Sequence, residues 1–105
     1  MRLVYSTFPS LEDARRVAED LLERRLIGCY NAFQIKSGYW WEGKINRDEE
    51  WACIFKTTDE KVKEVMKEVK KLHPYTTPAV FSIVVEDVDE DYENWLKEET
   101  RGDDA

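Results

Sequence analysis

The chain has 105 residues and a formal net charge of −7, from 16 basic and 23 acidic side chains. This length allows one domain of ordinary size, and 42% hydrophobic residues exclude a disordered chain. An acidic protein with no basic stripe lacks the phosphate-neutralising surface that nucleic acids require, so we expect no nucleic-acid partner. The sequence predicts a single domain over residues 1–105, with a frayed tail at 100–105.

No apolar run approaches the roughly 20 residues that a membrane helix needs. The apolar run at the start of the sequence is also too short for a signal peptide. We therefore expect no membrane partner and a cytoplasmic location. In that location Cys29 and Cys53 are expected to be reduced, with Cys53 buried in the core. A count of 1 Gln and 3 Asn beside abundant Lys and Glu is typical of a heat-adapted protein, so high thermal stability is expected.

The first elements in chain order are a strand and a helix. Residues 2–8 have strand composition and end at Pro9, which has no backbone N–H to donate to a sheet. Ser10 and Asp13 form a helix-capping pattern, and apolar residues at intervals of three and four predict one helix to about residue 26. Gly28 is expected to end that helix.

Residues 29–57 lose helix periodicity and are rich in β-branched and aromatic side chains. They predict one long antiparallel hairpin, bent at Ser37 and Gly38, with its turn somewhere between residues 42 and 49. Thr57 and Glu60 form a second capping pattern before a second helix, which Pro74 stops. Residues 79–85 then predict a fourth strand, and residues 89–99 a short terminal helix.

The resulting order is β-α-β-β-α-β plus a helix, the split arrangement of α+β ferredoxin-like folds, with both main helices on one face of an antiparallel sheet. The strands, however, are apolar on both faces, as "AVFSIVV" and "WACIFK" show. A sheet with one wet face should alternate, and one short terminal helix cannot cover four strands. The sequence therefore predicts that the protein associates with copies of itself.

Few residues in the chain offer chemistry. His73 is the single histidine, and Cys29 and Cys53 lie too far from it in sequence for a structural zinc site, although a copper site sharing Cys and His stays open. His73 either caps the end of its helix or, with Pro74 fixing the backbone, stands with Tyr75 at the rim of a cleft. No nucleophile with a base and no glycine-rich phosphate loop is present, so no catalytic residue is assigned and no enzymatic activity is expected.

The stretch "GYWWEG" at residues 38–43 places aromatic side chains on both faces of a strand. Tyr39 and Trp41 alternate with Trp40 and Glu42, so one pair can enter a core while the other needs a partner surface. Aromatic residues with a polar end are enriched at such surfaces.

With "YWWEGKI", "HPYTTPA" and "DYENWL" in this order, the sequence resembles the CutA family of divalent-cation tolerance proteins over nearly its whole length. The resemblance implies a ferredoxin-like subunit similar to PII signalling proteins, in a homotrimer whose long hairpin reaches an adjacent subunit. It also implies a link to tolerance of copper and other divalent metals. No cofactor is obligatory, and copper or another divalent cation is the implied ligand.

By motif position, the resemblance makes Cys29 and His73 the metal ligands of this chain. Two departures weaken such a site, because Ser6 stands where some members have a cysteine and Ala79 where many have a glutamate.

Three functions remain for comparison: a trimer that binds a divalent cation, a PII-like module that binds a small metabolite between subunits, and a stable scaffold without a ligand. In the second, the inter-subunit cleft would be lined by Tyr39, Trp41, Glu42, Lys44, Lys56, His73 and Tyr75.

Overall fold

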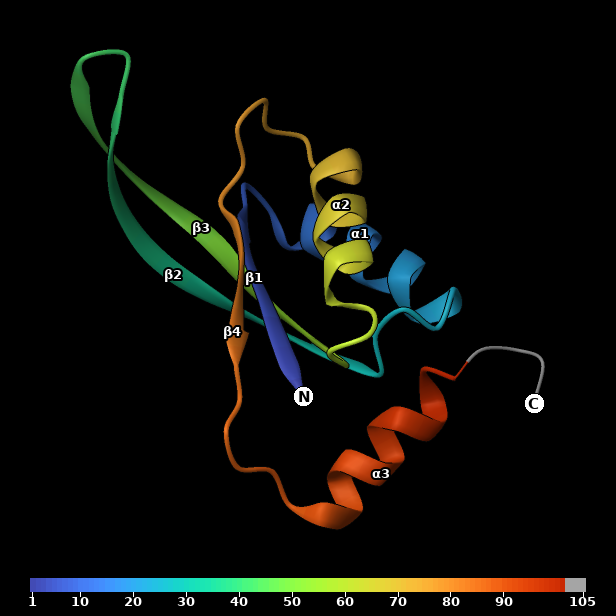
Figure 1. Ribbon diagram of the computed structural model, residues 1–105. Coiled ribbons are helices and arrows are strands. Elements are labelled where there is room, and N and C mark those ends of the chain that lie inside the picture. Colours follow the sequence, from blue (N-terminus) through green and yellow to red (C-terminus); the bar gives the residue numbers. More distant parts are fainter. Residues whose placement is uncertain (102–105) are drawn as a thin grey trace.

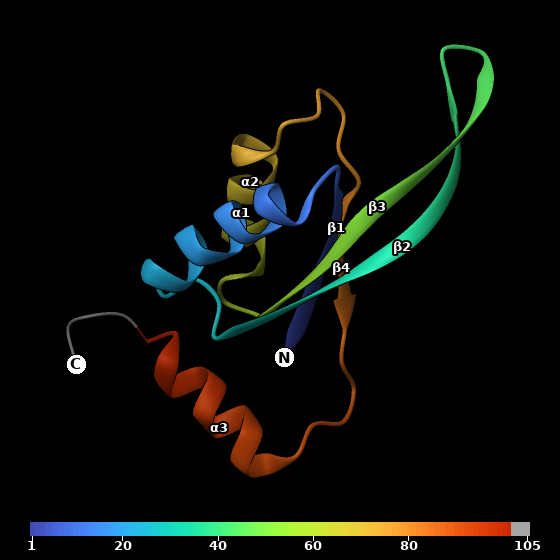
Figure 2. The ribbon, with the colours of Figure 1, turned by 180° about the vertical axis from the view of Figure 1, so that it is seen from behind.

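The computed structural model describes residues 1–101, which form four strands and three helices. The elements are β1 (Arg2–Phe8), α1 (Leu11–Glu23), β2 (Cys29–Trp41), β3 (Lys44–Thr57), α2 (Val62–Leu72), β4 (Val80–Val84) and α3 (Glu90–Glu99). The strands form one antiparallel sheet in the order β2-β3-β1-β4. This α+β arrangement is the predicted one, and α1 and α2 lie together on one side of the sheet (Figure 1; Figure 2).

The core lies between these two helices and the inner face of the sheet. Alternate residues of β1 point into it, and the apolar stripes of both helices meet them, as their spacing predicts. Its side chains are at most 5% exposed; they include Val4, Phe8, Val17, Leu21, Phe55, Val65 and Val69. One face of the sheet and one face each of α1 and α2 are therefore buried within a single chain.

The start of α1 confirms the predicted cap, but its end does not lie where it was expected. The Oγ of Ser10 accepts the backbone N–H of Asp13 at 3.1 Å. The helix stops at Glu23, and Arg25, with φ of 55°, turns the chain before Gly28 is reached. Gly28 instead makes room for α3, because a Cβ at this position would lie 2.6 Å from Cδ1 of Leu96.

The predicted cap at Thr57 is wrong. The chain passes through residues 58–61 before α2 starts, and Lys61, at the N-cap position, makes no side-chain cap hydrogen bond. Thr57 ends β3 as a fully buried residue whose hydroxyl donates to the carbonyl of Leu26 at 2.6 Å. Thr57, which belongs to a pattern that resembles a helix cap, thus connects the end of β3 to the link between α1 and β2.

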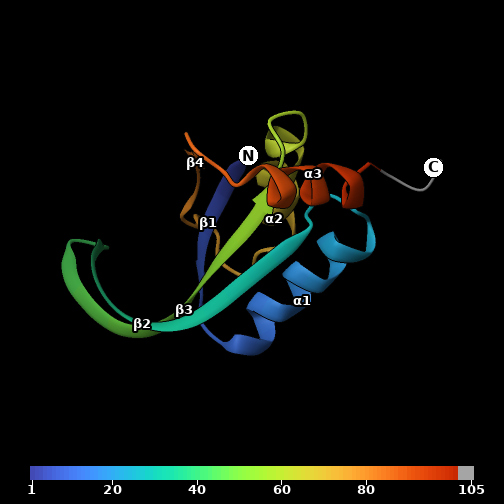
Figure 3. The ribbon, with the colours of Figure 1, turned by 90° about the horizontal axis from the view of Figure 1, so that it is seen from below.

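The turn of the long hairpin falls at Glu42 and Gly43, the start of the predicted range. Both residues have positive φ, 51° and 76°, the conformation of a two-residue turn that suits the twist of the strands. β2 continues through Ser37 and Gly38 without interruption, and the hairpin curls along its length instead of bending sharply there (Figure 3).

Only residues 51–57 of β3 pair with β1, so residues 35–41 and 44–50 form a two-stranded ribbon that projects from the sheet. We call this part of the hairpin the distal ribbon (Figure 1).

The last element, α3, packs beyond the end of the sheet at which β1 starts (Figure 1). The carboxylate of Asp89 caps it by accepting the N–H of Tyr92 at 3.0 Å. Thr100, placed in the predicted tail, is 1% exposed and its hydroxyl donates to the carbonyl of Leu96 at 2.8 Å. Residues 102–105 of that tail lie outside the described residues. Within residues 1–101, no helix has the length and apolar character needed to cross a membrane.

Candidate functional site

The structure places the predicted metal ligands, Cys29 and His73, at opposite ends of the sheet. Cys29 lies opposite Lys56 of β3, which in turn lies opposite Leu3 of β1. The ring of His73 instead contacts Thr7, four residues further along β1, which corresponds to about 13 Å of strand. A single chain therefore does not bring the thiol and the imidazole together.

His73 is 9% exposed, and its ring stacks on Phe8 with 4.3 Å between ring centroids. Its Nε2 lies 2.8 Å from the carbonyl of Thr7, and its Nδ1 lies 3.1 Å from the backbone nitrogen of Tyr75. A carbonyl only accepts and an amide N–H only donates, so the ring is neutral with its proton on Nε2. Burial lowers the pKa of His73, in keeping with this neutral form.

These contacts bear on the helix-capping role predicted for His73. The carbonyl of Leu72, at the end of α2, accepts from the guanidinium of Arg16 on α1 at 3.2 Å, while the imidazole turns to β1. The backbone N–H of His73 thus caps α2 by donating to the carbonyl of Lys70 at 3.4 Å, whereas its imidazole links β1 to the loop after α2. Both ring nitrogens have backbone partners, so a metal ion at His73 would have to displace one of them.

Tyr75 connects the loop after α2 to the base of the distal ribbon. Its hydroxyl donates to Glu50 at 2.9 Å, and this carboxylate is only 7% exposed. Burial, followed by the hydrogen bond to Glu50, raises the pKa of Tyr75 well above its ordinary value, and nearby Tyr39 and Asp48 act in the same direction. Tyr39, Asp48 and Glu50 of the distal ribbon thus form one cluster with Tyr75 and, through its backbone, His73.

Tyr39 belongs to this cluster through a short hydrogen bond from its hydroxyl to Asp48. That bond raises the pKa of Tyr39. Sequence reasoning named Tyr39, His73 and Tyr75 but missed Asp48 and Glu50. The strand register would have revealed these two residues. It places Tyr39 opposite Asn46, so alternate residues of β3 from 46 onwards, including Asp48 and Glu50, lie on the same face of the ribbon as Tyr39.

The tip of the distal ribbon carries three further residues predicted for the cleft: Trp41, Glu42 and Lys44. Trp40 is 71% exposed, while Trp41 and Ile45, which lies opposite Trp40, are each 50% exposed. Neither tryptophan enters the core of a single chain. Because Lys56 lies at the far end of β3, one chain does not assemble the seven predicted cleft residues into one site.

The two cysteines differ in environment, and both are free thiols. Cys53 is fully buried, as predicted, and burial raises its pKa to about 12. Cys29 is half-buried beside Lys56, whose ammonium lies 5.7 Å from the ring centroid of Tyr92 on α3. Among the residues described, no three His, Cys, Asp or Glu side chains are placed to hold a metal ion.

The face of the sheet that α1 and α2 do not cover is apolar, and we call it the outer face. It includes Phe33, Phe81 and Ile83, which are 42%, 48% and 43% exposed. Tyr5 of β1 stacks on Phe81 of β4 with 5.0 Å between centroids. Cys29 belongs to the same face, since it shares a row with Leu3 and Ile83.

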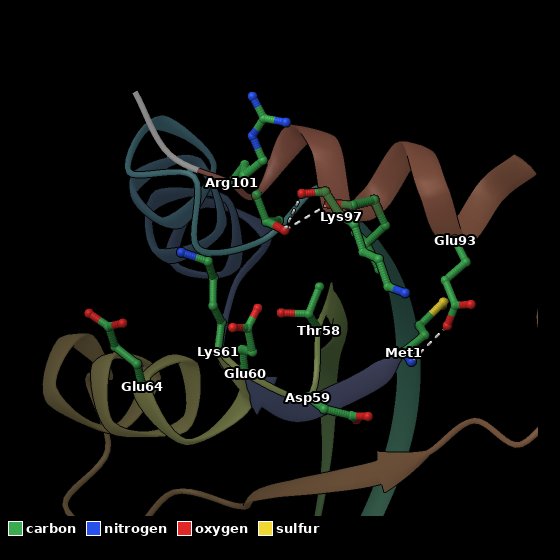
Figure 4. A pocket seen from close by; sticks show the side chains of 11 residues that line it. Met1, Thr58, Asp59, Glu60, Lys61, Glu64, Glu93, Lys97 and Arg101 are labelled. Atoms are coloured by element: carbon green, nitrogen blue, oxygen red, sulfur yellow. Dashed lines mark hydrogen bonds and ion pairs between the residues drawn. The ribbon is translucent and has the colours of Figure 1, made fainter. Parts of the chain in front are cut away.

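A cavity of about 680 Å³ opens between α3 and the start of α2 (Figure 4). Its lining includes acidic side chains from Asp59, Glu60, Glu64 and Glu93 and basic side chains from Lys61, Lys97 and Arg101. The mixed charges give it no clear preference for a cation or an anion. None of the site residues predicted from the sequence lines it.

The fold and the site define a small α+β protein of ferredoxin-like topology with an uncovered apolar sheet face and a projecting hairpin. The family described as CutA1 divalent ion tolerance protein matches residues 2–99. A divalent-cation tolerance protein CutA from Thermotoga maritima is 60% identical over 98 residues, which cover 93% of this chain and 97% of the relative. The chain therefore belongs to the CutA1 divalent ion tolerance protein family.

Solved structures support the same assignment. CutA1 from Pyrococcus horikoshii superposes with a TM-score of 0.91 at 46% identity, covering 94% of this chain and 97% of the other. The CutA protein from Archaeoglobus fulgidus gives a TM-score of 0.91 at 46% identity, with coverage of 95% and 99%.

The Archaeoglobus fulgidus protein is described as periplasmic, which contradicts the cytoplasmic location expected from the sequence. The expectation relied on the lack of a recognisable signal peptide, and such a lack does not specify a compartment. That both thiols are free does not depend on the compartment. The strand register places Cys29 opposite Lys56 and Cys53 opposite Ala32, so the two cysteines do not face each other.

Proposed function

We propose that this chain acts in divalent-cation tolerance as a homotrimer without catalytic activity, and that it binds copper or a similar ion through Cys29. The observation that carries the proposal is the uncovered outer face, because it is apolar and Cys29 lies on it. An exposed apolar surface of this kind favours contact with another protein surface. Association of copies through this face would place a neighbouring chain against Cys29.

The family supports the cation, since its relatives carry the name of divalent-cation tolerance proteins. A thiolate is a soft ligand that suits copper. Cys29 is half-buried and its thiol is free, whereas Cys53 is enclosed in the core. His73 is left out of the proposed ligand set because both of its nitrogens have backbone partners.

Association is tested by replacing Phe81 with aspartate on the outer face. We expect sedimentation velocity at micromolar concentration to give the mass of a trimer for the wild type and of a monomer for Phe81→Asp. A charge in the interface would lose its water without gaining a partner. The control Lys63→Asp places the same charge on an exposed part of α2 and should remain trimeric. A monomeric wild type would contradict the proposed assembly.

Cation binding is tested by titrating Zn²⁺, a divalent ion that binds thiolates, and cuprous ions without oxygen into the protein, with the two cysteines as a matched pair. Cys29→Ser should lose at least about tenfold in affinity, because serine is a poor ligand for a soft ion. Cys53→Ser and His73→Gln should bind as the wild type does. Equal affinity of Cys29→Ser and the wild type would exclude Cys29 as the ligand.

We also expect high thermal stability. Arg24 pairs with Asp20 at 2.8 Å and with Glu68 at 2.9 Å, which links α1 to α2 in a small network of charges. Such networks contribute more as temperature rises, because the penalty for desolvating charges falls.

A further inference from the structure

The ring of His73 joins segments that are distant in sequence. Through Nε2 it donates to Thr7 at the end of β1, and through Nδ1 it accepts from the backbone of Tyr75. Tyr75 in turn donates through its hydroxyl to Glu50, at the base of the distal ribbon. One imidazole therefore holds a continuous chain of contacts from β1 through the loop after α2 to β3.

Protonation would act on these two hydrogen bonds in opposite ways. The added proton can only go to Nδ1, because Nε2 already carries one. The Thr7 carbonyl still accepts from the charged ring and binds it more strongly. The backbone N–H of Tyr75, however, would then face another N–H across 3.1 Å. Two donors cannot share this contact, so the Tyr75 backbone has to move.

Charged and polar groups from three elements surround the ring. Asp13 on α1, Glu50 on β3 and the carbonyl of Thr7 favour the protonated form, whereas Arg16 on α1 opposes it. Burial is the largest influence and also opposes protonation, so the pKa of His73 lies below its ordinary value of about 6.5. The ring is thus neutral at neutral pH and takes up its proton only in acid.

The direction of the pH effect follows from this difference. A released or unfolded histidine binds its proton near pH 6.5, before the buried ring does. The closed arrangement is therefore fully stable above about pH 6.5, and it loses stability as the pH falls toward the lowered pKa of the buried ring.

We propose that His73 is an acid-operated latch: a proton on Nδ1 releases the backbone of Tyr75 and, through it, loosens the contact between the Tyr75 hydroxyl and Glu50 at the start of the distal ribbon. Pro74 lies between the two residues and restricts the backbone. A shift at His73 is therefore passed on to Tyr75. The latch does not depend on the proposed cation site, which lies at the other end of the sheet.

Amide hydrogen exchange of the intact protein, followed by NMR at about pH 7 and about pH 5, tests the latch. After correction for intrinsic rates, the Tyr75 amide should lose about tenfold or more of its protection at the lower pH. Core amides such as that of Val4, in the β1 ladder, should keep theirs. The chain has a single histidine, so its imidazole nitrogen signals report protonation of His73 without ambiguity.

The matched variant is His73→Gln, whose amide group can donate to Thr7 and accept from Tyr75 but does not titrate. It should hold the Tyr75 amide equally well at both pH values. Tyr75→Phe, which keeps the backbone but lacks the hydroxyl, should show the wild-type pH response at residue 75.

Three results would overturn the proposal. One is a wild-type ring that is protonated while the Tyr75 amide stays protected, and another is a ring that is still neutral at about pH 5. The third is a loss of Tyr75 protection in His73→Gln as large as in the wild type. The ring signals of the wild type are informative even if a variant does not fold.

Discussion

The two halves of the β2–β3 hairpin have similar residues in different surroundings. At its base, β3 is flanked by β1 and covered by helices, and Cys53 and Phe55 are fully buried. In the distal ribbon no third strand from residues 1–101 pairs with β2 or β3, and Trp40 and Ile45 stay 71% and 50% exposed. Apolar content alone thus does not show which surface covers a residue. The base is stabilised within one chain, whereas the ribbon presents apolar surface for another.

The largest expected effect separates the base from the tip directly. Phe55→Ala should lower the free energy of unfolding by about 3–5 kcal/mol, because it leaves a cavity in the core. Trp40→Ala should change it by less than about 0.5 kcal/mol in a monomer, since the side chain has little contact to lose. Chemical denaturation in the Phe81→Asp background measures both without association. Comparable losses in the two variants would refute the contrast.

The junction between the two halves is expected to show an intermediate effect. Tyr75→Phe removes the hydroxyl that donates to the buried carboxylate of Glu50, and should lower the free energy of unfolding by about 1–2 kcal/mol. Tyr39→Phe is the matched change, and it should have a smaller effect because its partner Asp48 is exposed to water. Urea denaturation of both variants would show this difference, and a larger loss for Tyr39→Phe would argue against the role given to Glu50.

The turn at the end of the ribbon should give the smallest effects, with opposite signs. Gly43 has φ of 76°, and a Cβ there would meet nothing within 4 Å, so Gly43→Ala adds backbone strain without a clash. We expect a loss of about 1 kcal/mol. Glu42→Gly should relieve the strain of a non-glycine residue at φ of 51°, giving a gain below about 1 kcal/mol. Melting temperatures that shift in the same direction would contradict this assignment of the turn.

Local signals were sufficient for the order of elements and for the inner core. The spacing of Val62, Val65 and Val69 defines one helix face without knowledge of the rest of the chain, and all three are buried. Capping was less reliable, because the same pattern is a true cap at Ser10 and a buried strand end at Thr57. The difference depends on where β3 ends, which a four-residue pattern does not contain.

The candidate site depends on contacts that are remote in sequence. His73 and Thr7 are 66 residues apart, and their hydrogen bond, which fixes the state of the ring, leaves no local pattern. Asp48 and Glu50 were missed for a related reason. Without an Asn-Gly or Asp-Gly pair, the turn was placed only within a range, and a shift of one residue moves every side chain to the other face.

The packing of α3 on the rest of the domain depends on the absence of a side chain at Gly28. The backbone N–H of Gly28 donates to the carbonyl of Lys56 at 3.0 Å, a bond that alanine or valine would keep. A bulkier residue would therefore leave the sheet connected while pushing Leu96 out of its seat. Gly28→Val should free α3 for cleavage by a protease while residues 1–85 resist it. The absence of a side chain at Gly28 thus decides whether α3 stays packed on the rest of the domain.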